Sequence, residues 1–325
     1  MRRPMEAFGS TGAVLCAIAI ALTANIASAQ QKPVRVLVGL APGGAAELVA
    51  RLYTEKLREV FKQPFIVENR VGASGLIAMD ALRAAPADGS VLLFAPNGGI
   101  TLISQTFKNP RFDPFKDVVP IAMVGIVEVV LVVNAATKAH SIAELVAAAK
   151  SDERVRNFGS APGTIPHLSA ALFADAAGLD LVHIPYKGAG QVIVDVLGGV
   201  LPASVVTAGE GVQHQKSGKV RILASFGAKR SPLIPDVPTM REVGYPVQTG
   251  GWFGFYAPAG TPADVVERIG RALVVASGAA DVRERLTQSG IEPVGKMGAE
   301  VAEVMRTDYA NWGRAMRLVK LQPQD

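Results

Sequence analysis

Cysteine is almost absent from this sequence, because Cys16 is the only one among 325 residues. Cys16 lies in an N-terminal segment that we expect to be removed, so the remaining chain forms no disulfide, uses no thiol nucleophile and binds no metal through cysteine. The four histidines are too widely dispersed for a helical metal-binding motif. The mature chain must therefore be stabilised by its hydrophobic core alone, and its length is sufficient for that.

Concentrated charge and complete catalytic motifs are also missing. The formal net charge is only +5, and the Lys and Arg residues are scattered along the chain. A nucleic-acid-binding protein would need a basic stripe with interleaved aromatic residues. The segment 159–163 has a Gly and a Ser but not the Gly-x-Ser-x-Gly spacing of a hydrolase, and no complete dinucleotide-binding or P-loop motif is present. We therefore expect no enzyme, no catalytic or metal-binding residue, no cofactor and no nucleic-acid partner.

The first 29 residues are typical of a secretory signal peptide. Arg2 and Arg3 are followed by an uncharged apolar run over residues 12–23, and the sequence Ala27-Ser28-Ala29 fits the small-x-small cleavage rule. An uncleaved membrane anchor is the alternative, but the run is shorter than the ~20 residues that span a bilayer. We expect cleavage after Ala29 and a periplasmic protein.

The mature chain alternates between short β-branched apolar runs and amphipathic segments. This alternation is typical of parallel α/β sheets, and about 295 residues exceed one comfortable core, so two domains are expected. The expected strands are 34–40, 65–67, 91–95, 129–133, 157–160, 181–184, 204–207, 220–225 and 252–256, and the expected helices are 46–61, 75–85, 142–150, 166–177, 190–197, 262–277 and 299–314.

No flexible linker separates the two halves, so strands are the expected connections between domains. The apolar segments 129–133 and 252–256 are suitable for that role. We predict a discontinuous first domain formed by residues 30–128 plus 250–325, and a second domain formed by residues 129–249. Periodicity alone does not exclude two sequential domains.

Three glycine-bearing loops follow predicted strands and lead into helices. Ligands of parallel α/β sheets bind beyond the carboxyl ends of the strands, where glycines admit close backbone approach and helix starts favour anions. An ordinary strand–helix turn remains the alternative for each loop taken alone. The predicted ligand contacts in these loops are Ala41, Pro42, Gly43, Gly44, Ala45, Asn97, Gly98, Ser160, Gly163, Thr164 and His167.

Asn97 and His167 each have a structural alternative. Asn97 is suited either to donate to a carboxylate or to fix a turn, and His167 is equally suited to a ligand contact and to a structural capping role. Glu128 is expected to be a solvated or paired carboxylate, with a general base as the less favoured interpretation. Arg51 and Arg70 are expected to form ordinary ion pairs rather than to clamp a ligand carboxylate.

Several stretches together resemble a known family. They are Ala41-Pro42-Gly43-Gly44, the segments 67–75 and 86–90, the run 158–168, His183-Ile184-Pro185-Tyr186-Lys187-Gly188, and the segments 197–199, 218–221, 229–232, 235–239 and 257–262. In this order they resemble the substrate-binding proteins of tripartite tricarboxylate transporters, the Bug family. They cover nearly the whole mature chain, and the set is more specific than any single stretch.

The resemblance implies a two-domain periplasmic-binding-protein fold of the Venus flytrap, type II-like kind, with a ligand cleft between the domains. It implies a receptor for a small organic carboxylate, a carboxylate-bearing amino acid or an aromatic acid, with membrane permease subunits as partners; we expect a monomer. Backbone amides at Pro42-Gly43-Gly44 would hold the carboxylate, opposite the loop of Ser160 and Thr164. Tyr186, Thr207 and Trp252 complete the predicted contacts.

The sequence departs from the family pattern at two acidic positions. Glu47 stands where the family often has Asp after a Thr, and Glu210 stands where a small polar residue is more usual. An acid near the ligand would repel a dianion and favour a ligand with an amine or amide. A binding protein that docks on a signalling partner instead of a permease remains the alternative function.

Overall fold

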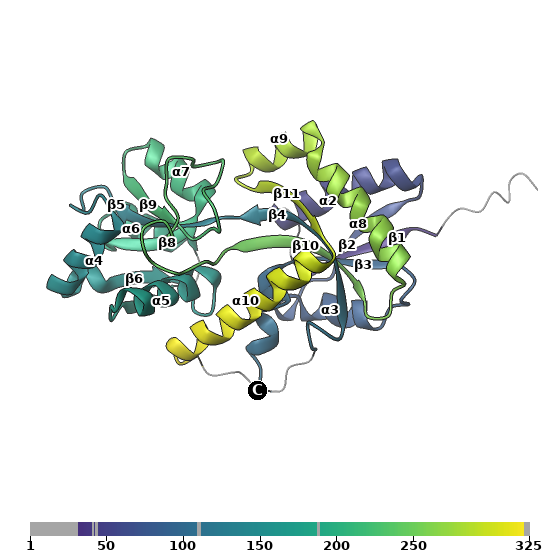
Figure 1. Cartoon of the computed structure of the whole chain (residues 1–325), viewed down its shortest axis with the longest axis horizontal. Coiled ribbons are helices and arrows are strands. Elements are labelled where there is room, and N and C mark those ends of the chain that lie inside the picture. Colours follow the sequence, from purple (N-terminus) through teal and green to yellow (C-terminus); the bar gives the residue numbers. More distant parts are fainter. Residues whose placement is uncertain (1–31, 41, 43–44, 109–111, 187–188, 322–325) are drawn as a thin grey trace, which may run out of the picture.

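The computed structural model describes residues 32–321 except 41, 43–44, 109–111 and 187–188. The predicted signal peptide lies outside the described residues. The described chain forms two lobes, each built on one sheet (Figure 1). Among the described residues, no helix is long and apolar enough to cross a membrane.

The first lobe contains a six-stranded sheet with the order β11-β4-β10-β3-β1-β2. β1 pairs in parallel with β2 and β3, whereas β10 runs antiparallel to both β3 and β4. Within this sheet, the prediction of parallel strands is therefore right for β1–β3 but not for β10, which enters the sheet from the opposite direction. The strands are β1 (Val34–Val38), β2 (Phe65–Asn69), β3 (Val91–Pro96), β4 (Val118–Val127), β10 (Gly251–Pro258) and β11 (Glu292–Met297).

The second lobe contains a five-stranded sheet with the order β7-β6-β8-β5-β9. β6 is parallel to β7 and β8, and β5 is antiparallel to β8 and β9. The strands are β5 (Val129–Asn134), β6 (Asn157–Ser160), β7 (Val182–Pro185), β8 (Ala203–Thr207) and β9 (Val220–Ser225).

Helices cover both faces of each sheet because their apolar residues recur at helical spacing. In the first lobe, α2 (Ala45–Phe61), α8 (Ala263–Gly278) and α9 (Ala280–Gln288) pack on one face, and α3 (Leu76–Arg83) and α10 (Ala299–Leu318) pack on the other. In the second lobe the helices are α4 (Ile142–Ser151), α5 (Ile165–Ala177), α6 (Ala189–Leu197) and α7 (Ala208–Lys216).

The lobes are joined by strands, as the sequence suggested. β4 continues through Glu128 into β5, and β10 returns from the second lobe into the first sheet (Figure 1). The first connection is rich in buried Val and Ile residues, whereas β10 is rich in buried aromatic residues.

The long helix α10 belongs to both lobes. Val301 and Met305 near its start lie in the core of the first lobe, whereas Trp312 and Met316 near its end lie in the core of the second. α10 also packs along α5. We propose the division into residues 30–128 plus 250–325 and residues 129–249, with the end of α10 shared with the second lobe.

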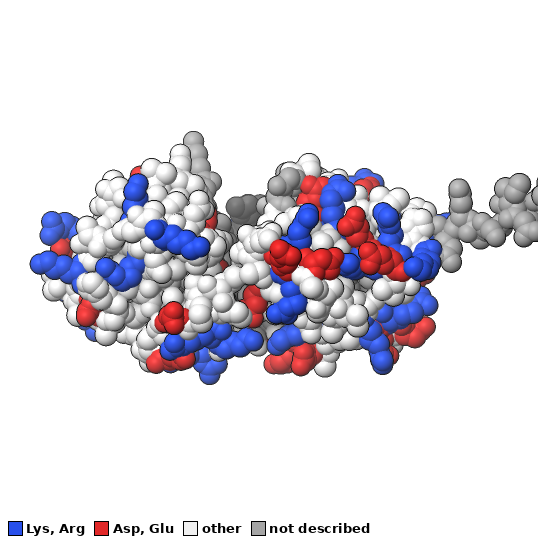
Figure 2. Space-filling view, turned by 90° about the horizontal axis from the view of Figure 1, so that it is seen from above, with Lys and Arg blue, Asp and Glu red and all other residues white. Residues whose placement is uncertain are grey.

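The face of the molecule in Figure 2 carries Lys and Arg side chains scattered over both lobes and interspersed with Asp and Glu. No continuous basic stripe crosses the described part of this face.

Candidate functional site

The carboxyl ends of β1, β2 and β3 point towards the second lobe. The register shows this, because Pro96 at the end of β3 pairs with Phe253 near the start of β10. β10 starts where the chain returns from the second lobe. The carboxyl ends of β1 and β3 therefore lie at the junction between the lobes.

The carboxyl ends of β6, β7 and β8 point back towards the first lobe. Thr207 at the end of β8 pairs with Val129 at the start of β5, immediately after the connection from β4. Because β6 and β7 run parallel to β8, their ends lie on the same side. The predicted loops of the two lobes thus face the same junction.

The Pro-Gly-Gly loop is only partly described. Pro42 is an exposed turn residue, and Ala45 is exposed at the first position of α2. Ala41, Gly43 and Gly44 lie outside the described residues. What the structure adds is the position of this loop, directly after a buried strand and directly before the start of α2.

Asn97 and Trp252 form a buried bridge rather than an open pair of ligand contacts. The Asn97 amide donates to the Gly250 carbonyl at 3.1 Å and to Asp308 Oδ2 at 2.8 Å, and Asn97 Oδ1 accepts from the Trp252 amide at 3.2 Å. Trp252 Nε1 donates to the same Asp308 oxygen at 2.7 Å. All polar side-chain groups of Asn97 are thus engaged by residues more than 150 positions away, while Gly98 next to it remains partly exposed.

Asp308 is the centre of this bridge. It lies on α10, and burial raises its pKa to about 6, although the hydrogen bonds from Asn97 and Trp252 lower it. The hydrogen bonds from Asn97 and Trp252 favour the ionised form of Asp308. Through these bonds, Asp308 joins α10 to the loop after β3 and to the start of β10. Nothing in the sequence marked Asp308, because its partners are more than 50 positions away.

The loop over residues 160–164 in the second lobe is held by side chains beneath it. Ser160 Oγ lies 2.8 Å from His183 Nε2, the Gly163 amide donates to His167 Nδ1 at 3.1 Å, and Thr164 Oγ1 donates to the Ala161 carbonyl at 2.7 Å. Gly163 has a φ of 72°, a left-handed conformation that favours glycine. The loop is therefore fixed before any ligand arrives.

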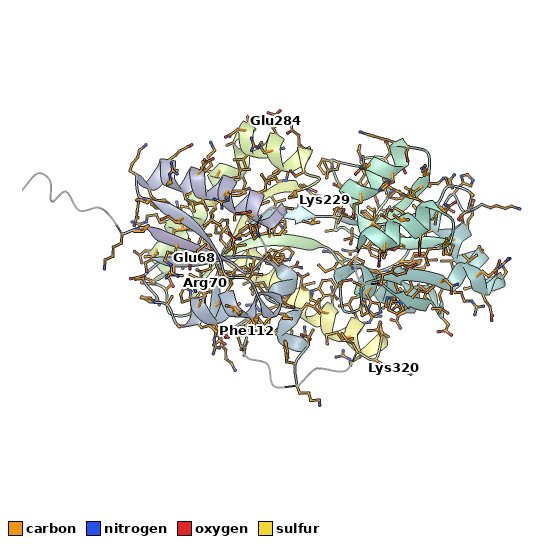
Figure 3. All side chains as sticks on the ribbon, turned by 180° about the vertical axis from the view of Figure 1, so that it is seen from behind. Glu68, Arg70, Phe112, Lys229, Glu284 and Lys320 are labelled. Atoms are coloured by element: carbon orange, nitrogen blue, oxygen red, sulfur yellow. The ribbon has the colours of Figure 1, made fainter. Side chains whose placement is uncertain are left out.

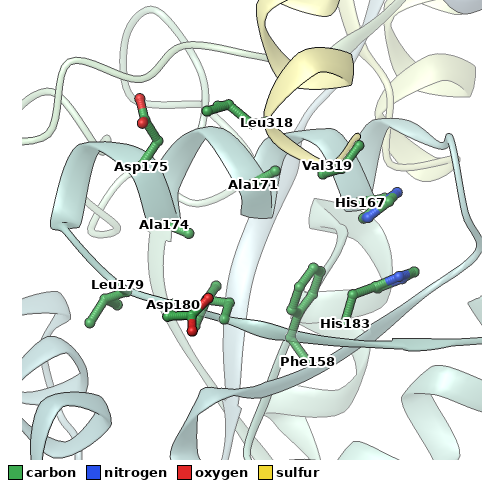
Figure 4. A pocket seen from close by; sticks show the side chains of 11 residues that line it. Phe158, His167, Ala171, Ala174, Asp175, Leu179, Asp180, His183, Leu318 and Val319 are labelled. Carbon is green, nitrogen blue, oxygen red and sulfur yellow. The ribbon is translucent and has the colours of Figure 1, made fainter. Parts of the chain in front are cut away.

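His167 and His183 stack on each other with ring centroids 3.9 Å apart and planes inclined by 19°. Phe158 lies beside them, and the three rings line a cavity of about 400 Å³ (Figure 4). Burial and the neighbouring His183 lower the pKa of His167 to about 4, and burial lowers the pKa of His183 as well. Two neutral imidazoles can stack closely, and each of these two contacts the loop over residues 160–164. These contacts favour the structural role for His167 over a ligand contact.

The start of α5 is not capped by its own side chain. Thr164 is the N-cap residue, but its hydroxyl bonds back to Ala161 instead of accepting from the first turn. By contrast, Ser141 caps α4, and Thr207 caps α7 through a capping box with Glu210. The first-turn amides of a helix have no intrahelical partners, so the start of α5 retains donors that an anion can accept.

The comparisons with known proteins agree on one family. The sequence profile of the "Tripartite tricarboxylate transporter family receptor" matches residues 49–321. Protein BugT of Bordetella pertussis is 32% identical over 289 residues, which cover 88% of this chain and 89% of BugT. The chain belongs to this receptor family.

Solved structures of similar proteins have the same fold. Rpa4515 of Rhodopseudomonas palustris with adipate is 27% identical, with a TM-score of 0.71, over 90% of this chain and 98% of that chain. MatC from the same organism, with bound malate, is 28% identical, with a TM-score of 0.67, over 87% and 98%. This receptor thus has the predicted two-domain periplasmic-binding-protein fold.

The two arginines nearest the loops of the receptor are engaged in ion pairs, as expected. Arg51 contacts Glu47 at 2.6 Å, and Arg70 contacts Glu68 at 2.5 Å. Figure 3 shows the side chains of Arg70 and Glu68 on the first lobe. Arg35 contacts the second oxygen of Glu68 at 2.7 Å. Arg51 is therefore paired with Glu47, and Arg70 shares the carboxylate of Glu68 with Arg35.

The remaining predicted contacts of the receptor have partners of their own. The Tyr186 hydroxyl donates to Asp195 Oδ2 at 2.5 Å, and Thr207 Oγ1 lies 2.8 Å from Glu210 Oε2. Glu210 also accepts from the Thr207 amide at 3.1 Å, so its carboxylate serves the capping box of α7. This removes the reason to regard Glu210 as an acid free to face a ligand.

The interpretation of Glu128 as a solvated carboxylate is wrong, because the residue is buried. Its side chain is 4% exposed, and its Oε1 atom has no hydrogen-bond partner among the described residues. The sequence placed it correctly beside an apolar strand but gave no indication that the second connection between the lobes covers it.

Proposed function

We propose that this receptor captures a small organic carboxylate between its two lobes and delivers it to the membrane subunits of a tripartite transporter. The observation that carries the proposal is the arrangement of the loops. The ends of parallel strands from both lobes face one junction, and the start of α5 there keeps its amide donors. Adipate and malate in the similar structures support a carboxylate as the ligand.

Backbone amides and hydroxyls, not arginine, are the proposed donors. Arg51 and Arg70 are paired with Glu47 and Glu68. A helix start contributes about 0.3–1 kcal/mol to an exposed anion and up to about 2 kcal/mol to a partly buried one. Two such starts and several hydrogen bonds suffice for micromolar affinity, which corresponds to about 8 kcal/mol. We propose Pro42-Gly43-Gly44 before α2 as the second start.

The proposed site of action is the periplasm, after removal of residues 1–29 at Ala29. The similar structure described as the periplasmic binding protein BugD, 29% identical to this chain, supports that location. Mass spectrometry of the exported protein tests it, with a mature chain starting at Gln30 as the expected result.

Ser160 and His183 do not suggest a hydrolase despite their 2.8 Å contact. Ser160 is only 3% exposed, and His183 Nε2 also lies 3.1 Å from the carbonyl of Ser160 itself. An attacking hydroxyl must reach a bound substrate and be aligned by its base. The contact therefore fixes the end of β6, and we assign it no catalytic step.

A thermal-shift screen with small mono- and dicarboxylic acids tests the proposed function. A ligand at one hundred times its Kd adds about 2.7 kcal/mol to the free energy of unfolding. At least one acid should raise the melting temperature by several degrees. No shift with any acid, together with a clear shift for uncharged sugars or for amines, would overturn the proposal.

A further inference from the structure

The connections between the lobes enclose a carboxyl group that the proposed function does not use. Glu128 lies between β4 and β5, and its carbonyl accepts from the Ala208 amide at the start of α7 at 2.8 Å. Its side chain is 4% exposed, and Oε1 has no hydrogen-bond partner among the described residues. A buried carboxyl group with an unsatisfied oxygen is costly in the ionised form.

The second connection is shaped around this carboxyl group. A Cβ atom at Gly227 would lie 2.2 Å from Glu128 Oε1, so any larger residue at that point would displace the carboxyl group. Two residues later, Lys229 reaches across to Glu292 on β11, with 3.7 Å between Nζ and Oε1. Figure 3 places Lys229 where the strands pass between the lobes.

The first lobe packs closely against α7 of the second lobe next to Glu128. Glu292 is only 7% exposed. Just before it, a Cβ atom at Gly290 would lie 3.1 Å from the Gly209 Cα atom in α7. We call this contact between the lobes the seam, and it consists of Glu128, Gly209, Gly227, Gly290 and Glu292.

A cavity of about 410 Å³ lies along the seam and gives room for water. Both glutamates line it. The other charged groups that line it are Lys229 on the second connection, Lys296 on β11 and Asp308 on α10. On α7, the nearest acid is Glu210, whose carboxylate is held in the capping box.

We propose that Glu128 is a proton-operated latch of the seam. With a proton on Glu128, the seam is closed as in this structure. Without the proton, Glu128 and Glu292 repel each other, water enters the cavity, and the lobes separate along the seam. This proposed separation of the lobes does not depend on the ligand being a carboxylate.

The acid–base behaviour of Glu128 agrees with this assignment. Burial and the charge of Glu292 raise its pKa to about 7, although Ser225 and the Gly227 amide lower it. In an open, hydrated seam the pKa would return towards its ordinary value of 4.5. Closing of the seam therefore takes up a proton at pH values between about 4.5 and 7. As the pH rises through this range, the ratio of molecules with a closed seam to molecules with an open seam falls by up to tenfold per pH unit.

Electron–electron distance measurements between two spin labels test the latch. The labels are placed at Gln213→Cys on α7 and Thr287→Cys on α9, both exposed, with Cys16 replaced by serine. Between pH 5 and pH 8.5, the distance distribution should shift towards longer distances. The Glu128→Gln variant keeps the shape of the side chain but cannot ionise, so its distribution should stay short throughout.

Two further variants distinguish Glu128 from its neighbours. Glu292→Gln removes the repelling charge and lowers the pKa of Glu128 in the closed seam, so its shift should be smaller and occur at lower pH, whereas Asp308→Asn should keep the shift of the wild type. If Glu128→Gln does not fold, Gly227→Ala provides the second test, because its methyl group displaces the carboxyl and should give long distances at every pH. An unchanged distribution in the wild type, or a wild-type shift in Glu128→Gln, would overturn the proposal.

Discussion

Two neutral histidines determine the shape of the ligand loop in the second lobe. His167 accepts from Gly163, His183 contacts Ser160, and the two rings stack on each other. Protonation of either ring would place charge in a poorly solvated stack. The loop geometry therefore depends on both imidazoles remaining neutral.

Replacing His167 with asparagine should reduce the acid sensitivity of the protein. The folded-state pKa of about 4 lies below the ordinary histidine pKa of 6.5, so stability is full above pH 6.5 and is lost as the pH falls towards 4. The loss attributable to His167 is about 3 kcal/mol at most. Urea unfolding at pH 7, 5.5 and 4.5 should show a shallower decline in His167→Asn, and an identical decline in both proteins would contradict this assignment.

Arg51→Ala and Arg70→Ala should each change ligand affinity by less than tenfold, or about 1.4 kcal/mol. The Arg51 and Arg70 side chains are 62% and 46% exposed, and they contact Glu47 and Glu68, respectively. Titration calorimetry with the acid that gives the largest thermal shift provides the measurement. A hundredfold loss in either variant would show that a guanidinium group binds the carboxylate directly.

At the scale of elements, the uncapped start of α5 is the feature that turns a fold into a binding site. Thr164→Asp should satisfy the first-turn amides with its own carboxylate and repel a bound anion. We expect unchanged or slightly higher thermal stability but at least tenfold weaker binding. Thr164→Asn, a neutral cap, is the matched control and should weaken binding less. Equal affinity in Thr164→Asp and the wild type would place the carboxylate elsewhere.

Most elements followed from sequence periodicity because their buried residues carry the pattern. The segments 157–160 and 220–225 match β6 and β9 at both ends, and the helix predicted at 46–61 starts one residue late. Their strand or helix pattern is continuous and bounded by turn residues. The order of the loops along the chain, and hence the candidate site, followed from the same pattern.

Four elements escaped prediction for local physical reasons. β4 contains Pro120 and Gly125, and the edge strand β11 contains Pro293 and Gly295, all of which weaken a strand pattern. α7 has two glycines within nine residues, and α9 is short. The Asn97–Trp252–Asp308 bridge could not be predicted because only tertiary packing brings these residues together.

At the scale of the whole molecule, α10 ties the two lobes together. Trp312→Ala should therefore destabilise the protein by about 3–5 kcal/mol, because Trp312 is fully buried in the core of the second lobe. Hydrogen exchange should accelerate in α5 of the second lobe although the substitution lies in a helix that starts in the first. Val275→Ala, at a residue 74% exposed, is the control and should change little. Unchanged exchange in α5 would mean that α10 serves the first lobe alone.

The central claim, that a ligand carboxylate is held by backbone donors between the lobes, is tested most directly by removing its charge. Titration calorimetry should compare the strongest-binding acid with its carboxamide analogue, which has nearly the same shape. The account predicts that the acid binds at least tenfold more tightly, because helix-start amides favour an anion over a neutral acceptor. Equal affinities for the acid and the amide would contradict the account.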